Sequence, residues 1–332
     1  MINSFNLSDK KQKGKTMYPL LLKPVHKQII WGGKRLITDF GFYSEHTNIA
    51  ESWMLTCRED GVNKITNGKY KGMTVEELIF NGNTHFLGRK YKGDGFPLLI
   101  KLIDAKKDLS VQVHPDDDYA KRNENSKGKT EAWYILDCDE GAELMYGFNK
   151  KISKEEFKQS VTDNTLLQYV HRVKVKKGDF FYIPAGTLHA IGGGILLAEV
   201  QQNCNTTYRI YDYNRLENGK KRPLHIDKAV DVTTTKPAKG NEAINTVKQG
   251  NTVIKNLCDS EYFNIKAVDI DGIFNIEPNI DSFMSIIMLD GNGTVSSDGV
   301  TETINKGNSI LILAESQNIS LKGKLSVLIS TQ

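Results

Sequence analysis

Four residues with side chains able to bind a metal stand at separate points of the sequence: Gln112, His114, Glu131 and His189. Gln112 and His114 are two apart in the alternating segment SVQVH, which predicts a strand, so their side chains share one face. Two imidazoles, one carboxylate and one amide oxygen can together coordinate a divalent cation. A set without thiolates can leave one coordination position open to substrate, as in catalytic zinc sites. In the alternative interpretation, each histidine is a hydrogen-bonded polar residue of a barrel or loop.

The cysteines argue against other kinds of metal site. The chain has four, Cys57, Cys138, Cys204 and Cys258, and none form a C-x-x-C pair. This spacing disfavours both a disulfide framework and a thiolate zinc site. It favours a reducing compartment, and we expect a cytoplasmic protein.

Composition and charge exclude several classes of partner. The 332 residues are 39% hydrophobic and 25% charged, with a net charge of only +4, which is typical of a folded globular chain. So small and dispersed an excess does not predict nucleic-acid binding. The most apolar long stretch, residues 180–200, contains Pro184, His189 and Glu199, so it does not predict a membrane helix.

Turn and capping signals indicate the elements that must position these side chains. The capping boxes Thr74–Glu77 and Ser153–Glu156 predict two short helices. The run FPLLIKLI, residues 96–103, predicts a buried strand. From about residue 240 onward, short β-rich runs alternate with Gly, Asn and Asp turns, a pattern typical of a sandwich or barrel.

A weak internal repeat divides the chain. Residues 177–185, KGDFFYIPA, resemble residues 306–314, KGNSILILA, and each segment predicts a turn that leads into a strand. Eleven residues after the glycine stand His189 in the first copy and Asn318 in the second, and no histidine follows His225. This self-similarity predicts two related β-barrels, of which the second lacks a metal centre. Alternatively, any Lys-Gly-Asp or Lys-Gly-Asn turn before a strand gives the same pattern.

Longer motifs connect the chain to a known family. The spacing Gly178-x5-Pro184-x-Gly186-x2-His189-x3-Gly193 matches the second signature of the cupin superfamily, with glycine in place of its usual final asparagine. The pair Gln-x-His with the later glutamate stands in for the first signature. Together with GKTEAWYIL, PAGTLHAIGGG and EVQQNCNTTYRIYDYNR in that order, these segments resemble the short bacterial form of type I mannose-6-phosphate isomerases. The resemblance runs from about residue 18 to residue 233.

The resemblance implies a fold class and a division into domains. We expect a mainly β protein with two cupin-like jelly-roll β-barrels and a few short helices inserted in its N-terminal half. Residues 1–16 are expected to form a disordered leader, and residues 17–240 a catalytic metal-binding domain. Residues 241–332 are expected to form a second barrel without a metal site. The sequence does not indicate the oligomeric state.

The resemblance also implies the reaction and the cofactor. The expected activity is the interconversion of mannose 6-phosphate and fructose 6-phosphate through an enediol, so the expected partner is a phosphorylated hexose. One Zn²⁺ per chain would be bound by Gln112, His114, Glu131 and His189. Two other functions stay open: a non-catalytic sugar-binding or regulatory cupin, and a non-haem-iron cupin oxygenase, since two histidines and a carboxylate also describe such iron sites.

Further residues take expected roles around that ion. The family's active-site arginine falls on Arg209, which could otherwise form a structural salt bridge. Lys129 is either a substrate-binding residue or a solvated loop lysine. Lys101 and Ser110 match positions near the substrate phosphate, although a carboxylate partner would equally relieve the cost of burying Lys101. The general base is open between Glu199, a metal-bound water and a histidine, and Glu199 could instead be a paired barrel residue.

One departure from the family pattern concerns a loop. This chain has Cys204 and Asn205 where the family commonly has Ser-Asp. Neither residue is an expected ligand, so the departure bears on the geometry of the loop more than on activity.

Overall fold

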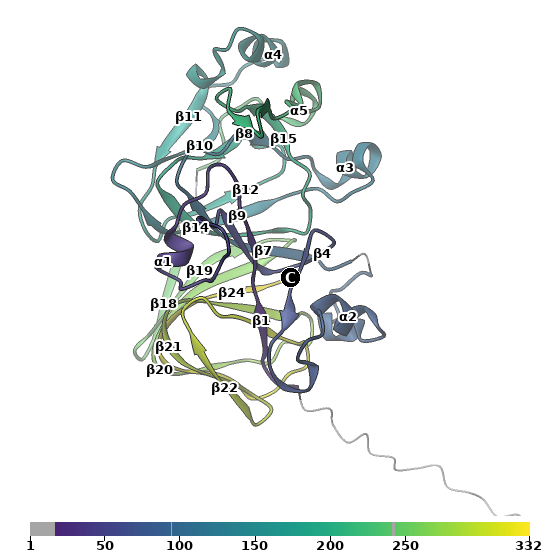
Figure 1. Cartoon of the computed structure of the whole chain (residues 1–332), viewed down its shortest axis with the longest axis vertical. Helices are drawn as coiled ribbons and strands as arrows, with labels where there is room; N and C mark the ends of the chain where they lie inside the picture. Colours follow the sequence, from purple (N-terminus) through teal and green to yellow (C-terminus); the bar gives the residue numbers. More distant parts are fainter. Residues whose placement is uncertain (1–16, 94, 241–242) are drawn as a thin grey trace, which may run out of the picture.

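A computed structural model describes residues 17–93, 95–240 and 243–332 (Figure 1). The predicted leader, residues 1–16, lies outside the described residues. The described part is mainly β, as expected. Its three larger sheets stack face to face as three layers. No helix in the described ranges is long and apolar enough to cross a membrane.

The middle layer is a six-stranded antiparallel sheet. Its order is β12 (Phe180–Ile183), β9 (Glu131–Cys138), β14 (Ile195–Gln202), β7 (Leu98–Ala105), β3 (Glu51–Leu55) and β2 (Val25–Lys27). Strands β7 and β14 are buried along their whole length. A continuous hydrophobic run such as FPLLIKLI therefore reflects a strand covered on both faces.

A five-stranded sheet covers one face of the middle layer. Its order is β11 (Val170–Lys174), β10 (Glu143–Phe148), β13 (His189–Ile191), β8 (Val111–Val113) and β15 (Tyr208–Tyr211). Between the two sheets lies a core that includes Ile103, Trp133 and Ile191. The outer face of the five-stranded sheet packs against helices, through residues such as Phe157 and Ala229.

Five short α-helices and three 3₁₀ turns decorate the N-terminal two thirds of the described chain. The two capping boxes begin helices as predicted, with Thr74 before α2 and Ser153 before α4. The helices are α1 (Arg35–Thr38), α2 (Val75–Phe80), α3 (Asp117–Glu124), α4 (Lys154–Thr162) and α5 (Ile226–Val232); the 3₁₀ turns are η1 (Gly68–Tyr70), η2 (Thr84–Leu87) and η3 (Leu166–Gln168).

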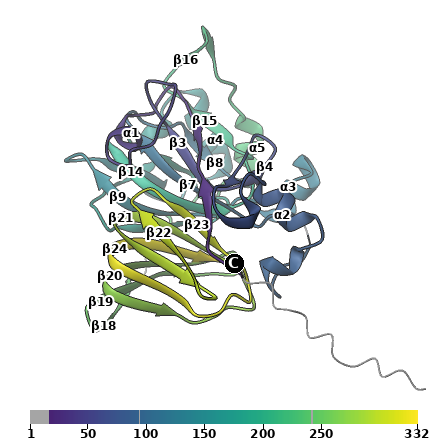
Figure 2. The ribbon, with the colours of Figure 1, turned by 60° about the horizontal axis from the view of Figure 1, so that its bottom comes forward.

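A nine-stranded C-terminal sheet covers the other face of the middle layer (Figure 2). Its core with the middle layer joins residues such as Ile100 and Val200 to Leu311 and Leu328. Its strands are β18 (Asn245–Gln249), β19 (Thr252–Asp259), β20 (Asn264–Ile276), β24 (Ile319–Thr331), β21 (Met284–Ser297), β22 (Val300–Asn305), β23 (Ser309–Ile312), β1 (Leu20–Lys23) and β6 (Lys64–Ile65).

The first strand of the chain therefore joins the sheet formed by its last third. Leu20 of β1 pairs with Leu311 of β23, and Leu22 pairs with Ile65 of β6. Two two-stranded ribbons complete the fold: β4 (Cys57–Arg58) with β5 (Gly61–Val62), and β16 (Leu216–Glu217) with β17 (Lys220–Lys221). The expected division at residues 240 and 241 stays a prediction, and strands β1 and β6 cross it.

Candidate metal centre

Three neighbouring strands of the five-stranded sheet present a row of site residues. His189 at the start of β13 lies opposite Gln112 of β8, and Gln112 lies opposite Arg209 of β15. Directly opposed residues of antiparallel strands project from the same face. His114, two residues beyond Gln112, shares that face.

The middle sheet supplies the carboxylate from the facing side. Glu131 is the first residue of β9, and Trp133 follows two residues later on the same face. Trp133 lies opposite Glu199 of β14, and Glu199 lies opposite Lys101 of β7. The site is therefore built between the two sheets of the N-terminal half.

His114, Glu131 and His189 converge at this position. Their ligating atoms all lie within 4.8 Å of one another, and the residues are only 0–1% exposed. His114 Nε2 lies 3.4 Å from Glu131 Oε2, and His189 Nε2 lies 3.4 Å from Glu131 Oε1. Each imidazole therefore directs the same ring nitrogen toward the shared carboxylate.

Backbone carbonyls fix the orientation of both imidazoles. His114 Nδ1 lies 2.9 Å from the carbonyl oxygen of Thr206, and His189 Nδ1 lies 2.8 Å from that of Thr187. A carbonyl only accepts, so each Nδ1 carries the proton and donates it. This leaves the Nε2 lone pairs free for a metal ion, the arrangement common among histidine ligands.

Two of the atoms that face one another, His114 Nε2 and Glu131 Oε1, are buried without a hydrogen-bond partner within the described residues. The other carboxylate oxygen, Glu131 Oε2, is contacted by Lys129 Nζ at 2.9 Å. Unpartnered buried polar atoms are costly and rare. Nitrogen and carboxylate donors without thiolates suit Zn²⁺ as well as other divalent ions, so the residues present fit the expected cofactor.

Gln112 lies at the edge of this cluster. Its Nε2 is 3.4 Å from His189 Nε2, and its Oε1 is 3.4 Å from Ser110 Oγ. Rotation of the amide by half a turn exchanges its oxygen and nitrogen, which are assigned from hydrogen-bond networks. In the rotated form the amide oxygen faces the imidazole nitrogens and can serve as a fourth ligand.

Charge keeps these groups in the forms that bind metals. Burial opposes ionisation of Glu131, but Lys129, whose Nζ lies 2.9 Å from Oε2, and His114 outweigh it and hold the pKa well below its usual range. Burial, reinforced by Lys129, lowers the pKa of His114 to about 3. Burial also lowers the pKa of His189. A neutral imidazole and an ionised carboxylate are the ligating species.

Lys129 is a buried residue in direct contact with the cluster. Its side chain is 5% exposed, so it is not a solvated loop lysine. Ser110 is also buried, and its hydroxyl lies beside Gln112. Both residues therefore lie next to the predicted ligands, while their contact with substrate stays a prediction.

Lys101 finds carboxylate partners within the protein. Its Nζ lies 2.9 Å from Glu199 Oε1 and 3.6 Å from Glu51 Oε2. Burial opposes its charge, but these two carboxylates outweigh burial and raise the pKa of Lys101. The cost of burying Lys101 is thus relieved without phosphate, and its expected role in phosphate binding stays a prediction.

Glu199 is held from two sides. Trp133 Nε1 donates to its Oε2 at 3.0 Å, and Lys101 neutralises its Oε1. Burial and the charge of Glu131 raise the pKa of Glu199 nonetheless. A carboxyl group with a raised pKa is a stronger base once ionised.

Arg209 has no carboxylate at ion-pair distance in the described ranges. Its Nη1 donates to the carbonyl of Pro223 at 3.0 Å, and its buried Nε has no hydrogen-bond partner there. Burial and the neighbouring Arg222 lower the pKa of Arg209. The structural salt bridge considered for this residue is therefore absent from the described contacts, and the guanidinium keeps a donor available.

Sequence reasoning missed several residues that shape the site. The carbonyls of Thr187 and Thr206 orient the histidines, and no side-chain pattern marks them. Trp133 and Glu51 were also missed. Trp133 could have been found, because it stands two residues after Glu131 and a period-2 pattern places Glu131 and Trp133 on one face. The departure at Cys204 is accommodated locally, because its sulfur accepts from the amide of Thr206 at 3.3 Å.

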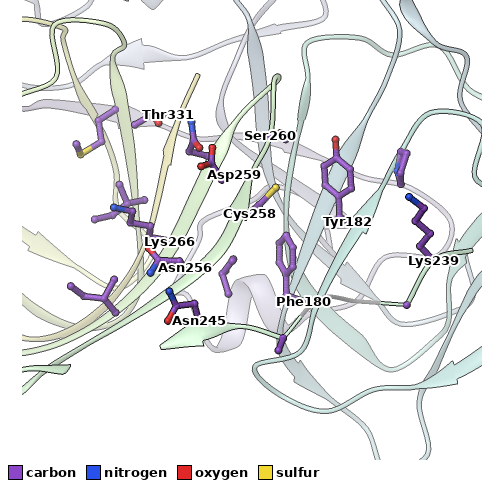
Figure 3. A pocket seen from close by; sticks show the side chains of 18 of the residues that line it. Phe180, Tyr182, Lys239, Asn245, Asn256, Cys258, Asp259, Ser260, Lys266 and Thr331 are labelled. Atoms are coloured by element: carbon purple, nitrogen blue, oxygen red, sulfur yellow. The ribbon is translucent and has the colours of Figure 1, made fainter. Parts of the chain in front are cut away.

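A wide groove lies elsewhere, between the N-terminal half and the C-terminal sheet (Figure 3). Its volume is about 1420 Å³, and Tyr182 and Phe180 line one wall while Asn256 and Lys266 line the other. None of the expected ligands or site residues lines it. The groove is therefore distinct from the cluster of His114, Glu131 and His189.

Comparison with known proteins identifies relatives along almost the whole chain. Residues 20–152 match the catalytic domain of phosphomannose isomerase type I, and residues 253–332 match the cupin domain of mannose-6-phosphate isomerase. Mannose-6-phosphate isomerase ManA of Bacillus subtilis is 38% identical over 317 residues, 95% of this chain and 99% of the relative. The mannose-6-phosphate isomerase of Streptococcus mutans is 36% identical over 314 residues, 94% of this chain and 98% of that protein.

Solved structures agree with these matches. The crystal structure of mannose 6-phosphate isomerase from Bacillus subtilis superposes with a TM-score of 0.89 at 38% identity, covering 94% of this chain and 99% of the other. A variant of phosphomannose isomerase from Salmonella typhimurium gives a TM-score of 0.76 at 16% identity, over 94% and 98% of the two chains. At that identity the second likeness shows the fold alone.

Proposed function

This chain belongs to the type I phosphomannose isomerase family, and from that premise we propose that it interconverts mannose 6-phosphate and fructose 6-phosphate at the cluster of His114, Glu131 and His189. The observation that carries the proposal is the convergence of three buried residues whose ligating atoms all lie within 4.8 Å of one another. Family membership does not favour the two alternatives, an iron oxygenase and a non-catalytic cupin.

The proposed cofactor is one Zn²⁺ held by His114, Glu131, His189 and Gln112. The donor set suits it, because zinc accepts imidazole nitrogen and carboxylate oxygen. When bound, the ion would polarise the sugar carbonyl and stabilise negative charge on adjacent oxygens. The neutral imidazoles and the ionised carboxylate are supplied by the protein before metal arrives.

Arg209 is proposed to stabilise the enediolate formed during isomerisation. The reaction moves a proton from C2 of the open-chain aldose to C1 and the hydroxyl proton of O2 to O1, and negative charge develops on the carbonyl oxygen when C2 loses its proton. A guanidinium remains charged and presents several donors in a fixed plane. The proposal is supported by its Nε, a buried donor for which the described residues supply no hydrogen-bond partner.

Glu199 is proposed as the group that moves the proton. It is buried, its pKa is raised, and Trp133 and Lys101 fix its two oxygens. In this scheme Lys129, Ser110 and Lys101 bind the substrate, and Lys101 also holds Glu199 in place. A base must come within about 2.6–3.2 Å of the proton path, directly or through one water.

The direct test is a coupled assay that follows fructose 6-phosphate formed from mannose 6-phosphate. We expect turnover that a chelator abolishes and added Zn²⁺ restores, with no dependence on oxygen. Activity that persists after verified removal of metal would contradict the metal proposal. Absence of turnover in the metal-loaded protein would contradict the proposed function.

We also propose the finer architecture expected from the sequence. Residues 17–240 and 241–332 would form two cupin-like jelly-roll barrels, and the second would lack a metal. The facing five- and six-stranded sheets support a two-sheet unit in the N-terminal half. A cytoplasmic location also stays a prediction.

A further inference from the structure

Residues 128–130, the segment that precedes Glu131 of the candidate metal centre, are fixed by side chains and a loop carbonyl, without a neighbouring strand in the described part of the chain. Residues 128–130 are buried, yet they precede β9 and have no strand partner for their amides. Lys129 and Glu131, which meet at the cluster, lie within or directly after this segment. Its position therefore decides where both charged groups lie.

Two side chains and one carbonyl satisfy the three consecutive amides. The amide of Gly128 donates to Asp117 Oδ1 at 2.7 Å, and that of Thr130 donates to Gln202 Oε1 at 2.7 Å. The amide of Lys129 donates to the carbonyl of Pro115 at 3.0 Å. Side chains from α3 and the end of β14 thus take the place of a neighbouring strand.

The two side chains are also joined to each other. Gln202 Nε2 donates to Asp117 Oδ1 at 3.2 Å and to Oδ2 at 3.3 Å. The amide of Gln202 therefore uses its oxygen for the segment and its nitrogen for the carboxylate. Close packing completes the contact, because a Cβ on Gly128 would lie 2.4 Å from the backbone nitrogen of Asp117.

We propose that Gln202 and Asp117 form a clamp that positions Lys129 and Glu131 for metal binding and isomerisation. Neither clamp residue touches the cluster itself, so both are positioning residues. The proposal rests on the proposed function only for its effect on turnover. Hydrogen-bonded partners behind metal ligands typically change affinity or activity by about ten- to a hundredfold when altered.

The test exchanges the charge between the two clamp residues. Gln202→Glu alone sets one carboxylate against another. Asp117→Asn alone puts an amide N–H group in place of one acceptor oxygen beside Gln202 Nε2, and leaves a single oxygen to accept from both Gln202 and the amide of Gly128. The double variant Q202E/D117N restores complementarity, because the new amide donates to the new carboxylate and each segment amide keeps an acceptor. Asp118→Asn is the matched control: it removes the same charge from the same exposed helical turn, and the Asp118 side chain makes no hydrogen bond or ion pair within the described residues.

We expect kcat/KM for mannose 6-phosphate to fall about ten- to a hundredfold in each single variant. The double variant should recover most of that loss, since residues in one hydrogen-bond network are not additive. Hydrogen exchange at the amides of residues 128–130 should quicken in the single variants and return toward wild type in the double variant. Asp118→Asn should change neither quantity.

Hydrogen exchange at these amides does not depend on turnover, so it reports on the clamp even if the protein lacks isomerase activity. If Gln202→Glu unfolds the chain, Asp117→Asn still tests the idea from an exposed position. Unchanged exchange in a folded single variant would overturn the proposal. A folded double variant that stays as impaired as the single variants would overturn it equally.

Discussion

The two similar segments, residues 177–185 and 306–314, share a turn, but among the described residues only the first leads to a histidine of the candidate metal centre. In the N-terminal half, the amide of Gly178 donates to the carbonyl of Ile135, and the amide of Ile135 donates to that of Asp179. In the C-terminal half, Gly307 and Asn308 make the same pair of bonds with Met288. Side chains agree as well, because Asp179 accepts from the amide of Lys176 and Asn308 accepts from that of Asn305.

The copies diverge eleven residues after the glycine. His189 begins a strand and is 1% exposed, whereas Asn318 is exposed with a left-handed φ of 52°. The C-terminal sheet encloses a hydrophobic core of aliphatic residues such as Ile286, Ile310 and Val327. The comparison teaches that the turn belongs to the scaffold, while chemistry depends on which side chains face the interior.

The largest expected contrast lies between those two positions. His189→Ala should lower kcat about a thousandfold or more, because a bound metal supplies several kcal/mol of transition-state stabilisation. Asn318→Ala should leave kcat unchanged. Steady-state kinetics and metal content of both purified variants check this, and a His189→Ala protein with normal metal content would contradict the ligand assignment.

Arg209→Ala should give the next largest effect. Loss of one donor to a developing oxyanion typically costs about 2.7–4 kcal/mol, roughly a hundred- to a thousandfold in kcat. The fold should remain intact, because within the described residues the guanidinium donates a hydrogen bond only to the carbonyl of Pro223. Near-normal turnover would show that the role is wrong.

Core truncations should separate stability from chemistry. Ile286→Ala in the C-terminal core should cost about 2–5 kcal/mol of unfolding free energy and leave kcat unchanged at 25 °C. Ile191→Ala, in the strand that begins with His189, should lower both quantities. Urea denaturation and steady-state kinetics of both variants check this. Equal losses of kcat in Ile286→Ala and Ile191→Ala would contradict the separation of stability from catalysis.

The smallest expected effects concern the shared glycines. Gly178 and Gly307 have φ of +89° and +85°, where an alanine is strained by about 1–2 kcal/mol. A Cβ at Gly178 meets nothing within 4 Å, whereas at Gly307 it would lie 2.8 Å from Phe42. Gly307→Ala should therefore be the more destabilising variant in urea denaturation. The reverse order would show that the turns differ in a way these contacts do not capture.

Local signals in the sequence predict local structure well. The capping boxes mark α2 and α4, because the bonds that begin a helix lie within four residues. The hydrophobic run around residue 100 marks a strand covered on both faces. Period-2 spacing correctly places Gln112 and His114 on one face.

Long-range pairing could not be predicted in the same way. No local pattern places Leu20 opposite Leu311, or Lys101 between Glu51 and Glu199. The carbonyls that orient the histidines are invisible in side-chain patterns. Motif resemblance named His114, Glu131 and His189 together, and the structure brings these three side chains close to one another; their role as metal ligands stays a prediction.

The most direct test of the central claim is a crystal of zinc-loaded protein measured on both sides of the zinc absorption edge. We predict one anomalous peak per chain, about 2.0–2.2 Å from His114 Nε2, His189 Nε2 and a Glu131 oxygen, with the Gln112 amide oxygen as the fourth ligand. A fully loaded protein whose peak lies elsewhere, with these side chains uncoordinated, would contradict it.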